Sequence, residues 1–339
     1  MKKELGISTL LVVVCAVTAL KNPAFLSATN LANLANIIGL YGIFSIGLGL
    51  IIITGGIDLS VGSMFALGGV LLAMALRDWN WPWPLAAMFV ILVPMVLGWI
   101  HGLLITRLRI QAFIVTLCGL LLYRGLARYV AKDTTKGFGT SEGFEALRFL
   151  AKGRLFRHTV DDTVNGVVQS RVVFEGIPMP FIVLILVTIV MWFVLHRSIF
   201  GRHLLAVGRN EEATRFSGIN TRRLVASTYV VGGLLTGISS VLFAFYTNSV
   251  SPSTHGNFYE LYGIAAAVLG GCSLRGGEGS ILGIVIGTAL LQVLQNLVNL
   301  LGIDSSLNFA VIGAVVLVGV LADQLLQQRS AARQVRAGH

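Results

Sequence analysis

The segment GGIDLSVGS, residues 55–63, places an aspartate and two serines between two long apolar runs. Such a segment can cap a helix, contribute to an ion or substrate site, or act as a hinge. Asp58 and Ser60 suit the first role best, because their oxygens can accept hydrogen bonds from the free amides of a helix N-terminus. An ion site is the least favoured, since Asp58 has no visible partner carboxylate. The residues expected to shape this turn are Gly55, Gly56, Asp58, Ser60, Gly62 and Ser63.

Hydroxyl and amide side chains form a second pattern, in and just after the apolar run 280–298. Their spacings of 4, 3, 1 and 3 residues place them on one stripe of a helix. Amides in a membrane are costly unless they bond to each other or to water. The stripe therefore predicts either hydrogen bonds between helices or the lining of a hydrated path for a polyhydroxylated solute. Tyr41, Glu260 and Tyr262, expected near the outer ends of two other spans, would add to such a path. The stripe comprises Thr288, Gln292, Gln295, Asn296 and Asn299.

A third pattern lies in the polar stretch GRHLLAVGRNEEATRFSGINTRR, residues 201–223. It predicts a helix of about two turns, which is too short to be stable alone and therefore needs a partner surface. The alternative is a solvated loop with a stray turn. The expected features are the cap Asn210, the acidic first-turn residues Glu211 and Glu212, an i,i+4 pair of Glu211 with Arg215, and Gly218 in a left-handed position after the last turn.

The sequence lacks the motifs that are typical of several kinds of enzyme and metal site. There is no G-x-x-x-x-G-K-[ST] phosphate loop, so we expect the chain not to bind ATP by itself. There is no H-E-x-x-H motif and no close grouping of serine, histidine and aspartate, and the three cysteines show no paired spacing. We therefore expect no enzyme activity, no cofactor and no metal site. Asp58, Glu260 and Asp304 are expected near the ends of spans, whereas an ion-coupled carrier needs ionisable groups at mid-depth. Energy is expected to enter from another protein.

The elements that must position these residues are membrane helices. The 339 residues are 55% hydrophobic and only 12% charged, with a mean hydropathy of +0.83, whereas soluble domains carry about 25% charged residues. We expect an all-α polytopic membrane protein, one transmembrane domain over residues 1–339. About ten spans are predicted, near residues 5–20, 34–54, 60–76, 84–106, 111–130, 180–196, 224–246, 259–273, 280–298 and 308–326.

Basic residues predict the orientation. With both termini in the cytoplasm, the cytoplasmic segments hold fourteen lysines and arginines, whereas the short outer loops hold only Lys21 and Arg77. The net charge of +10 is therefore attributed to orientation and to lipid headgroups, and nucleic acid is not an expected partner. The first span resembles a secretory signal, which leaves open whether it is retained or cleaved; retention is favoured because more spans follow at once.

Two segments are too long to be simple turns. Residues 131–178 are expected outside and contain an amphipathic run, EGFEALRFLAKGRLF, followed by a hairpin pattern, VDDTVNGVVQSRVVFEG, with the turn signal Asn165-Gly166. Residues 197–223 are expected in the cytoplasm and carry the predicted short helix.

The sequence also contains an internal similarity. LYGI occurs at 40–43 and 261–264, and Gly-Gly occurs at 55–56 and 276–277, both at an offset of 221 residues. Chance similarity is one explanation, because the chain is rich in glycine and leucine. The other is that the second and eighth spans have equivalent roles in a repeated architecture, with Gly-Gly closing each span at the cytoplasmic side.

Three motifs in order resemble a known family. GGIDLSVGS at 55–63, GRNEEATRFSGIN at 208–220 and ELYGIAAAVLGGCSLRGGEGSILG at 260–283 are similar to bacterial sugar ABC-importer permeases of the ribose, xylose and arabinose class. The similarity runs from about residue 25 to 325. An ion-coupled secondary sugar carrier is the alternative.

This resemblance implies partners and a location. It implies a permease that works as a pair in the bacterial inner membrane, with two ATP-hydrolysing subunits and a periplasmic sugar-binding protein that delivers a monosaccharide or similar polyol. It further implies that Asn210, Glu211, Ala213, Ser217 and Gly218 dock on the ATPase. Residues 131–178 depart from the family because they are longer and more charged, and they are expected to contact the binding protein. The particular sugar and the identity of the second permease copy are left open.

Overall fold

The computed structural model describes residues 2–139, 143–164 and 167–304, together with single residues up to 317. The helices are α1 (Lys2–Lys21), the 3-10 helix η1 (Pro23–Leu26), α2 (Ala28–Ile53), α3 (Val61–Arg77), α4 (Trp83–Thr106), α5 (Ala112–Val130), α6 (Glu145–Lys152), α7 (Met179–His196), α8 (Ile199–Arg209), α9 (Glu211–Phe216), α10 (Thr221–Thr247), α11 (Tyr259–Leu269) and α12 (Ile281–Leu300). The predicted span 308–326 and the C-terminus fall largely outside the described residues.

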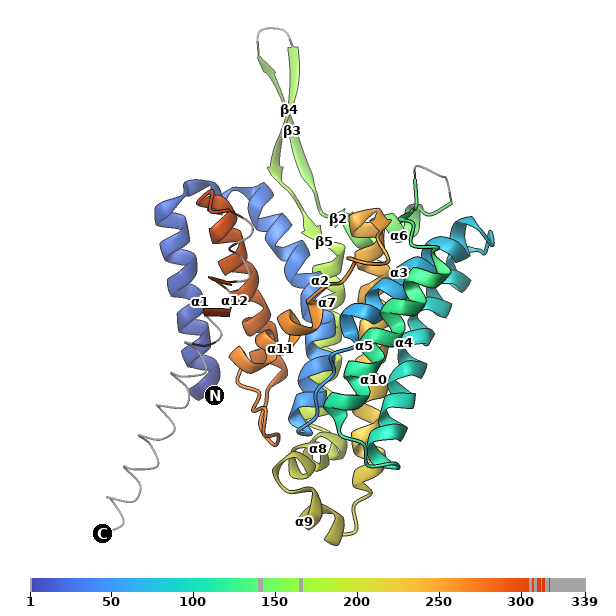
Figure 1. The fold of residues 1–339 in the computed structure, drawn as a ribbon. Coiled ribbons are helices and arrows are strands. Elements are labelled where there is room, and N and C mark those ends of the chain that lie inside the picture. Colours follow the sequence, from blue (N-terminus) through green and yellow to red (C-terminus); the bar gives the residue numbers. More distant parts are fainter. Residues whose placement is uncertain are drawn as a thin grey trace, which may run out of the picture.

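Apolar helices form the body of the molecule (Figure 1). Within the described residues, six of them are long and apolar enough to cross a membrane: α2, α4, α5, α7, α10 and α12. Three shorter apolar helices, α1, α3 and α11, also coincide with predicted runs. The chain is thus a multi-pass helical membrane protein, as its composition predicts.

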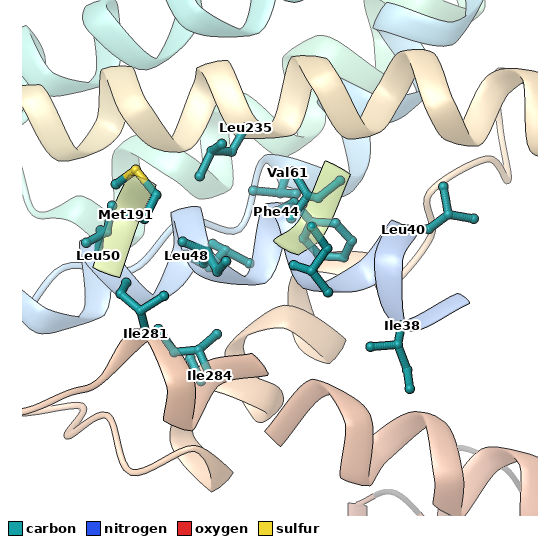
Figure 2. Packing of buried hydrophobic residues seen from close by; sticks show 14 of the residues in the cluster. Ile38, Leu40, Phe44, Leu48, Leu50, Val61, Met191, Leu235, Ile281 and Ile284 are labelled. Carbon is teal, nitrogen blue, oxygen red and sulfur yellow. The ribbon is translucent and has the colours of Figure 1, made fainter. Parts of the chain in front are cut away.

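Helix α2 is the centre of the bundle. In its most apolar stretch 83% of the residues are buried, compared with 22% in α7 and 28% in α4. The latter two helices therefore present most of their side chains to the surroundings. Figure 2 shows Phe44 and Leu48 of α2 packed among side chains of neighbouring helices, including Leu235 of α10 and Ile284 of α12. Because α2 packs against several neighbouring helices, a movement of any of these helices must also change its packing against α2.

Helices α4 and α10 lie side by side at very short range. A Cβ atom at Gly233 would lie 2.2 Å from the Pro94 carbonyl oxygen, and one at Gly98 would lie 2.1 Å from the Tyr229 carbonyl oxygen. Small residues permit such close contact between membrane helices, where dispersion and packing drive association.

Helix α11 does not cross the membrane alone. It has 11 residues, or about 16 Å of helix, whereas a bilayer core is about 30 Å thick. Figure 1 shows α11 at mid-height of the bundle, reached by a chain segment that descends from the end of α10. The predicted run 259–273 is therefore too long, because the helix ends at Leu269. The first residue of α11, Tyr259, starts well inside the bundle.

Short strands lie at one end of the molecule. The strands are β1 (Lys136–Gly137), β2 (Arg154–Leu155), β3 (His158–Val164), β4 (Val167–Phe174), β5 (Ile177–Pro178) and β6 (Ser249–Val250). β3 and β4 form the predicted antiparallel hairpin, which projects away from the helices (Figure 1); its turn, Asn165-Gly166, lies outside the described residues. β1 pairs with β6 and β2 pairs with β5. The predicted amphipathic run forms α6, which buries Leu147 and Ala151.

An ionic cluster attaches the hairpin base to α2. Glu175 accepts a hydrogen bond from Thr29 Oγ1 over 2.9 Å and forms an ion pair with Arg154. Arg157 Nε lies 3.6 Å from the same carboxylate. We call Thr29, Arg154, Arg157 and Glu175 the outer clasp. The Thr29 hydrogen bond and the two arginines lower the pKa of Glu175 below its ordinary value of 4.5.

The outer clasp predicts a pH-dependent stability. A carboxyl group whose folded-state pKa is lowered stabilises the fold above its unfolded-state pKa and loses that effect as pH falls through the folded-state value. We expect Glu175→Gln to lower the thermal unfolding midpoint at pH 7, and the difference from the unmodified protein to vanish as pH falls below about 4. Glu212→Gln, on exposed α9, is the control. A difference that stays constant from pH 7 to pH 3 would contradict this role.

Candidate functional site

The turn at 55–63 connects α2 to α3, and its polar contacts differ from the prediction. Asp58 is buried, and its Oδ1 accepts hydrogen bonds from the Ser60 amide at 2.8 Å and from Ser60 Oγ at 2.6 Å. Ser60 occupies the N-cap position of α3, but its side chain makes no capping hydrogen bond. Ser63 Oγ donates to the Ser60 carbonyl oxygen over 2.7 Å. The prediction is therefore wrong for Ser60, whose side chain makes no capping hydrogen bond, whereas Asp58 does accept a hydrogen bond from the amide at the N-cap position of α3.

The N-terminus of α3 lies against an acidic residue of another helix. The Glu260 carboxylate on α11 lies beside Gly62, in the first turn of α3. A Cβ atom at Gly62 would lie 2.3 Å from Glu260 Oε2 and 2.2 Å from the Gly256 carbonyl oxygen. Residue 62 must therefore be glycine for the carboxylate to approach. Because an acidic group at a helix N-terminus is electrostatically favourable, Glu260 stabilises α3 from about two hundred residues away along the chain.

Arg124 joins α5 to the same place. Its Nη1 donates to the carbonyl oxygens of Pro252 at 3.2 Å and His255 at 2.7 Å, and its Nη2 donates to the Gly62 carbonyl oxygen at 3.2 Å. One guanidinium thus holds the start of α3 and the descending segment before α11 together. We call Gly62, Arg124, His255 and Glu260 the buried clasp. No motif considered from the sequence contained Arg124, although an arginine inside the apolar run 111–130 is itself a signal of a buried functional contact.

Further buried polar groups surround Asp58. The Tyr123 hydroxyl lies 2.7 Å from His101 Nε2, and the Tyr229 hydroxyl donates to the Ile57 carbonyl oxygen over 3.3 Å. The Asp58 carboxylate acts electrostatically on all three of these side chains. Asp58 and Glu260 do lie at helix ends, as expected, but those ends are inside the bundle. Because Asp58 and Glu260 are buried, a lack of buried charge does not serve as an argument against an ion-coupled carrier.

The contacts of Asp58 predict different results for two substitutions. An asparagine in its place retains an oxygen that can accept both hydrogen bonds from Ser60, so we expect Asp58→Asn to change the free energy of unfolding by less than about 1 kcal/mol. Asp58→Leu leaves the amide and hydroxyl of Ser60 buried without an acceptor, at about 1–3 kcal/mol for each group. Thermal unfolding in detergent measures both effects. Equal losses in the two variants would show that the charge, and not the hydrogen bonds, stabilises the turn.

The predicted path residues do not form one lining. Tyr41 and Tyr262 lie together, with ring centroids 5.7 Å apart, and Gln295 lies near the Tyr262 hydroxyl. Asn296 exchanges hydrogen bonds with Asn30 of α2. The remaining stripe residues lie elsewhere: Thr288 bonds to its own helix at the Ile284 carbonyl, Gln292 is buried and Asn299 is exposed.

Two further corrections concern the same set. Tyr41 sits in the middle of α2, and not near its outer end, in contact with Phe44, Phe243 and Tyr259. Glu260 belongs to the buried clasp and not to the stripe. Interhelical hydrogen bonding, one of the two alternatives, is therefore observed for Asn296.

Helix α9 has most of the predicted features. Asn210 accepts a hydrogen bond from the Ala213 amide over 2.9 Å, and Gly218 follows the helix with φ +82°. Glu211 and Glu212 occupy the first turn, and Ser217 ends the helix. The predicted Glu211–Arg215 ion pair is not among the contacts of the described residues; the Arg215 guanidinium lies 5.8 Å from the ring of Phe216 instead. A groove of about 430 Å³ beside α9 is lined by Glu211, Glu212 and Arg215 together with Arg109 and Arg222.

A contact of backbones links α9 to the centre of the bundle. Gly208, two residues before the cap of α9, is so close that a Cβ atom there would lie 1.9 Å from the Ile53 carbonyl oxygen and 2.3 Å from the Gly277 amide nitrogen. The Gly277 amide also donates to the Ile53 carbonyl oxygen over 2.8 Å. Gly276 lies against Gly55. We call Gly55, Gly208, Gly276 and Gly277 the glycine junction.

The glycine junction revises the interpretation of the internal similarity. Gly55 follows the end of α2 with φ +78°, as expected for a closing glycine. Gly276 and Gly277 do not close α11, which ends seven residues earlier, before Gly270. The two Gly-Gly pairs instead lie side by side at the end of the molecule that carries α9. Gly208 was not predicted, since its role depends on contacts with two distant segments.

Comparison with known proteins identifies the class. Residues 30–321 match the family described as the permease component of the branched-chain amino acid transport system. The chain belongs to this family of transport permeases. Its membrane helices and the short capped helix α9 agree with that assignment, and the family consists of transporter subunits and not enzymes.

Individual relatives share nearly the whole chain. The ribose import permease of Bacillus subtilis is 36% identical over 323 residues, which is 95% of this chain and 93% of that protein. The ribose import permease of Escherichia coli K12 is 33% identical, with 94% and 92% covered. The xylose transport system permease of the same organism is 30% identical, with 91% and 88% covered. No solved structure matches the chain.

Proposed function

We propose that this protein is the membrane subunit of an ATP-driven importer for a monosaccharide, most closely a pentose. The substrate class is inferred from relatives named for ribose import and xylose transport, which align along nine-tenths of the chain or more. The chain itself performs no chemistry. It provides a path, and a separate ATPase provides the energy.

One structural observation supports the coupling role most directly. Helix α9 is exposed at one end of the bundle, is capped by Asn210, and is joined through Gly208 to the end of α2 and to the α11–α12 loop. A force applied to α9 by a partner would therefore reach the backbone of the central helix through rigid contacts. We propose Asn210, Glu211, Glu212, Ala213, Arg215, Ser217 and Gly218 as the docking element for the ATPase.

The proposed assembly and orientation follow from this role. Both termini and α9 lie in the cytoplasm of a bacterial cell, and the hairpin projects outside the inner membrane. Ten membrane-embedded segments are proposed, the tenth from residues 308–326, with α11 entering the membrane without crossing it alone. Two copies of the permease, or this chain and a similar one, bind two ATPase subunits. The substrate passes between the two permease subunits near Tyr41, Tyr262 and Gln295. The second and eighth spans would then have equivalent roles.

The segment 131–178 is proposed to contact the sugar-binding protein. The hairpin β3–β4 projects beyond the helices on the side opposite α9 (Figure 1), and the outer clasp fixes its base to α2. Deleting residues 159–173 while keeping the outer clasp should weaken docking of the binding protein. Unchanged docking would remove this proposal and leave the permease function intact.

Uptake by cells tests the substrate class. A bacterium lacking its own ribose and xylose permeases is given this chain together with the ATPase and binding protein encoded beside it, and uptake of labelled sugars is measured. We expect uptake of one pentose or hexose that depends on all three proteins. Uptake of a branched-chain amino acid and of no sugar would overturn the proposed substrate while keeping the family assignment.

A further inference from the structure

A groove lies between the α9-side ends of α4 and α10. It has a volume of about 620 Å³, and its lining includes Trp99, Leu103, Arg107, Arg222, Arg223 and Ser227. It is separate from the buried clasp and from the glycine junction. In the proposed orientation it opens at the level of the cytoplasmic headgroups.

The groove carries positive charge without a matching acid. Arg107, Arg222 and Arg223 are all exposed, and none of them forms an ion pair with another described residue. The first turn of α10 contains two of these arginines and no acidic residue, although the N-terminus of a helix favours negative charge. Glu211 and Glu212 line the neighbouring groove beside α9, which shares Arg222 with this groove, but they do not line this groove itself. The arrangement favours an anion bound between Arg107 and Arg223.

An apolar stripe on α4 leads into the groove. Met88, Leu92, Val96 and Trp99 are exposed large side chains at spacings of 4, 4 and 3 residues, so they lie along one face of the helix. Leu103, one turn beyond Trp99, belongs to the lining of the groove. A ligand that filled both features would have an acyl chain along the stripe and a charged head among the arginines.

We propose that this groove binds an anionic phospholipid of the cytoplasmic leaflet, with its phosphate held by Arg107 and Arg223 and an acyl chain against Trp99 and Val96. This site rests on the proposed membrane orientation and adds a ligand to it. Arginine pairs with phosphate through two parallel hydrogen bonds, and basic pockets between membrane helices on the cytoplasmic side suit anionic headgroups. Tryptophan at this level suits the boundary between headgroups and acyl chains.

Lipid binding to the purified full-length permease tests the site. Phosphatidylglycerol and phosphatidylcholine of equal chain length are titrated in detergent, and bound lipid is counted by native mass spectrometry. We expect phosphatidylglycerol to bind more tightly. The double variant Arg107→Gln/Arg223→Gln should weaken its binding about twenty-five-fold, because each arginine near the surface contributes about fivefold. The control Arg202→Gln/Arg275→Gln removes the same charge from exposed positions outside the groove. Equal binding of the two lipids, or equal weakening in the two variants, would overturn the proposal.

A fluorescence measurement keeps the proposal testable if the double variant does not fold. Phosphatidylglycerol with a brominated chain should quench the fluorescence of Trp99, taken as the difference between the unmodified protein and Trp99→Phe, more strongly than brominated phosphatidylcholine does. Inorganic phosphate at millimolar concentration should not relieve the quenching. Relief by phosphate would assign the groove to a soluble anion. Loss of quenching when the ATPase is bound would assign it to the protein interface. Either result would overturn a lipid site. Failure of the sugar-uptake experiment, by contrast, leaves this result unaffected.

Discussion

Replacing Gly208 by alanine is expected to reduce ATP-driven uptake at least tenfold. The new Cβ atom would overlap the Ile53 carbonyl oxygen and the Gly277 amide, at 1.9 and 2.3 Å. Both are backbone atoms in helix ends or turns, so they cannot rotate away as a flexible side chain could. The glycine junction must therefore open, and overpacking of this kind costs about 1–3 kcal/mol or more. Uptake by cells, normalised to the amount of permease in the membrane, measures the effect.

A matched control separates the junction from glycine replacement in general. Gly125 of α5 is exposed, and a Cβ atom there would meet nothing within 4 Å. Gly125→Ala should leave uptake unchanged, because alanine is the better helix former by about 1 kcal/mol. If Gly208→Ala transports at the unmodified rate, the close contact among α8, α2 and the α11–α12 loop does not carry the coupling.

Removing the guanidinium of Arg124 is the second change with a large expected effect. Arg124→Leu leaves the carbonyl oxygens of Gly62, Pro252 and His255 without their donor and places Glu260 in the bundle without its nearby positive charge. A buried carbonyl oxygen that loses its donor costs about 1–3 kcal/mol. We therefore expect a large fall in the thermal unfolding midpoint and loss of uptake. Arg124→Lys should recover only part of both, since one ammonium group cannot span the same three acceptors.

Arg128 provides the matched control for Arg124. It lies one turn further along α5, and its side chain is 53% exposed and pairs with the equally exposed Asp133. Exposed ion pairs contribute only about 0–1 kcal/mol, so Arg128→Leu removes the same charge with little loss of stability. Equal effects of Arg124→Leu and Arg128→Leu would show that the buried clasp is not what holds α3 and α11 together.

The buried clasp also shows where sequence reasoning stops. The Asn210 cap and Gly218 of α9, the hairpin strands and the nine apolar helices of the described residues were all predictable, because each depends on neighbours within a few residues. The approach of Glu260 to the start of α3 was not, since its carboxylate lies on a different helix and reaches Gly62 only after the bundle has folded. Of the nearer candidates, Ser60 bonds to Asp58 instead of capping the helix.

The side chains on α12 do not form the single lining that their spacing suggested, for a related reason. Helical spacing correctly placed Gln292, Gln295, Asn296 and Asn299 on one helix, but spacing does not say which neighbour each side chain meets. Asn296 reaches α2, Gln295 reaches α11, and Gln292 is buried. A single hydrated lining would require the same neighbour for all of them. Arg124 could have been identified from its position inside an apolar run. This position is the strongest indication of the buried clasp in the sequence.

The energy source is the central claim, and transport by reconstituted vesicles tests it most directly. The permease and its ATPase are placed in liposomes that enclose the sugar-binding protein with its labelled sugar, so that ATP can be added on the ATPase side. We predict sugar release from the vesicle interior that requires ATP hydrolysis, persists when ionophores collapse the proton and sodium gradients, and is lost in Gly208→Ala. Transport without ATP that stops when an ion gradient is collapsed would contradict the account and would assign the buried charges Asp58, Arg124 and Glu260 to ion coupling.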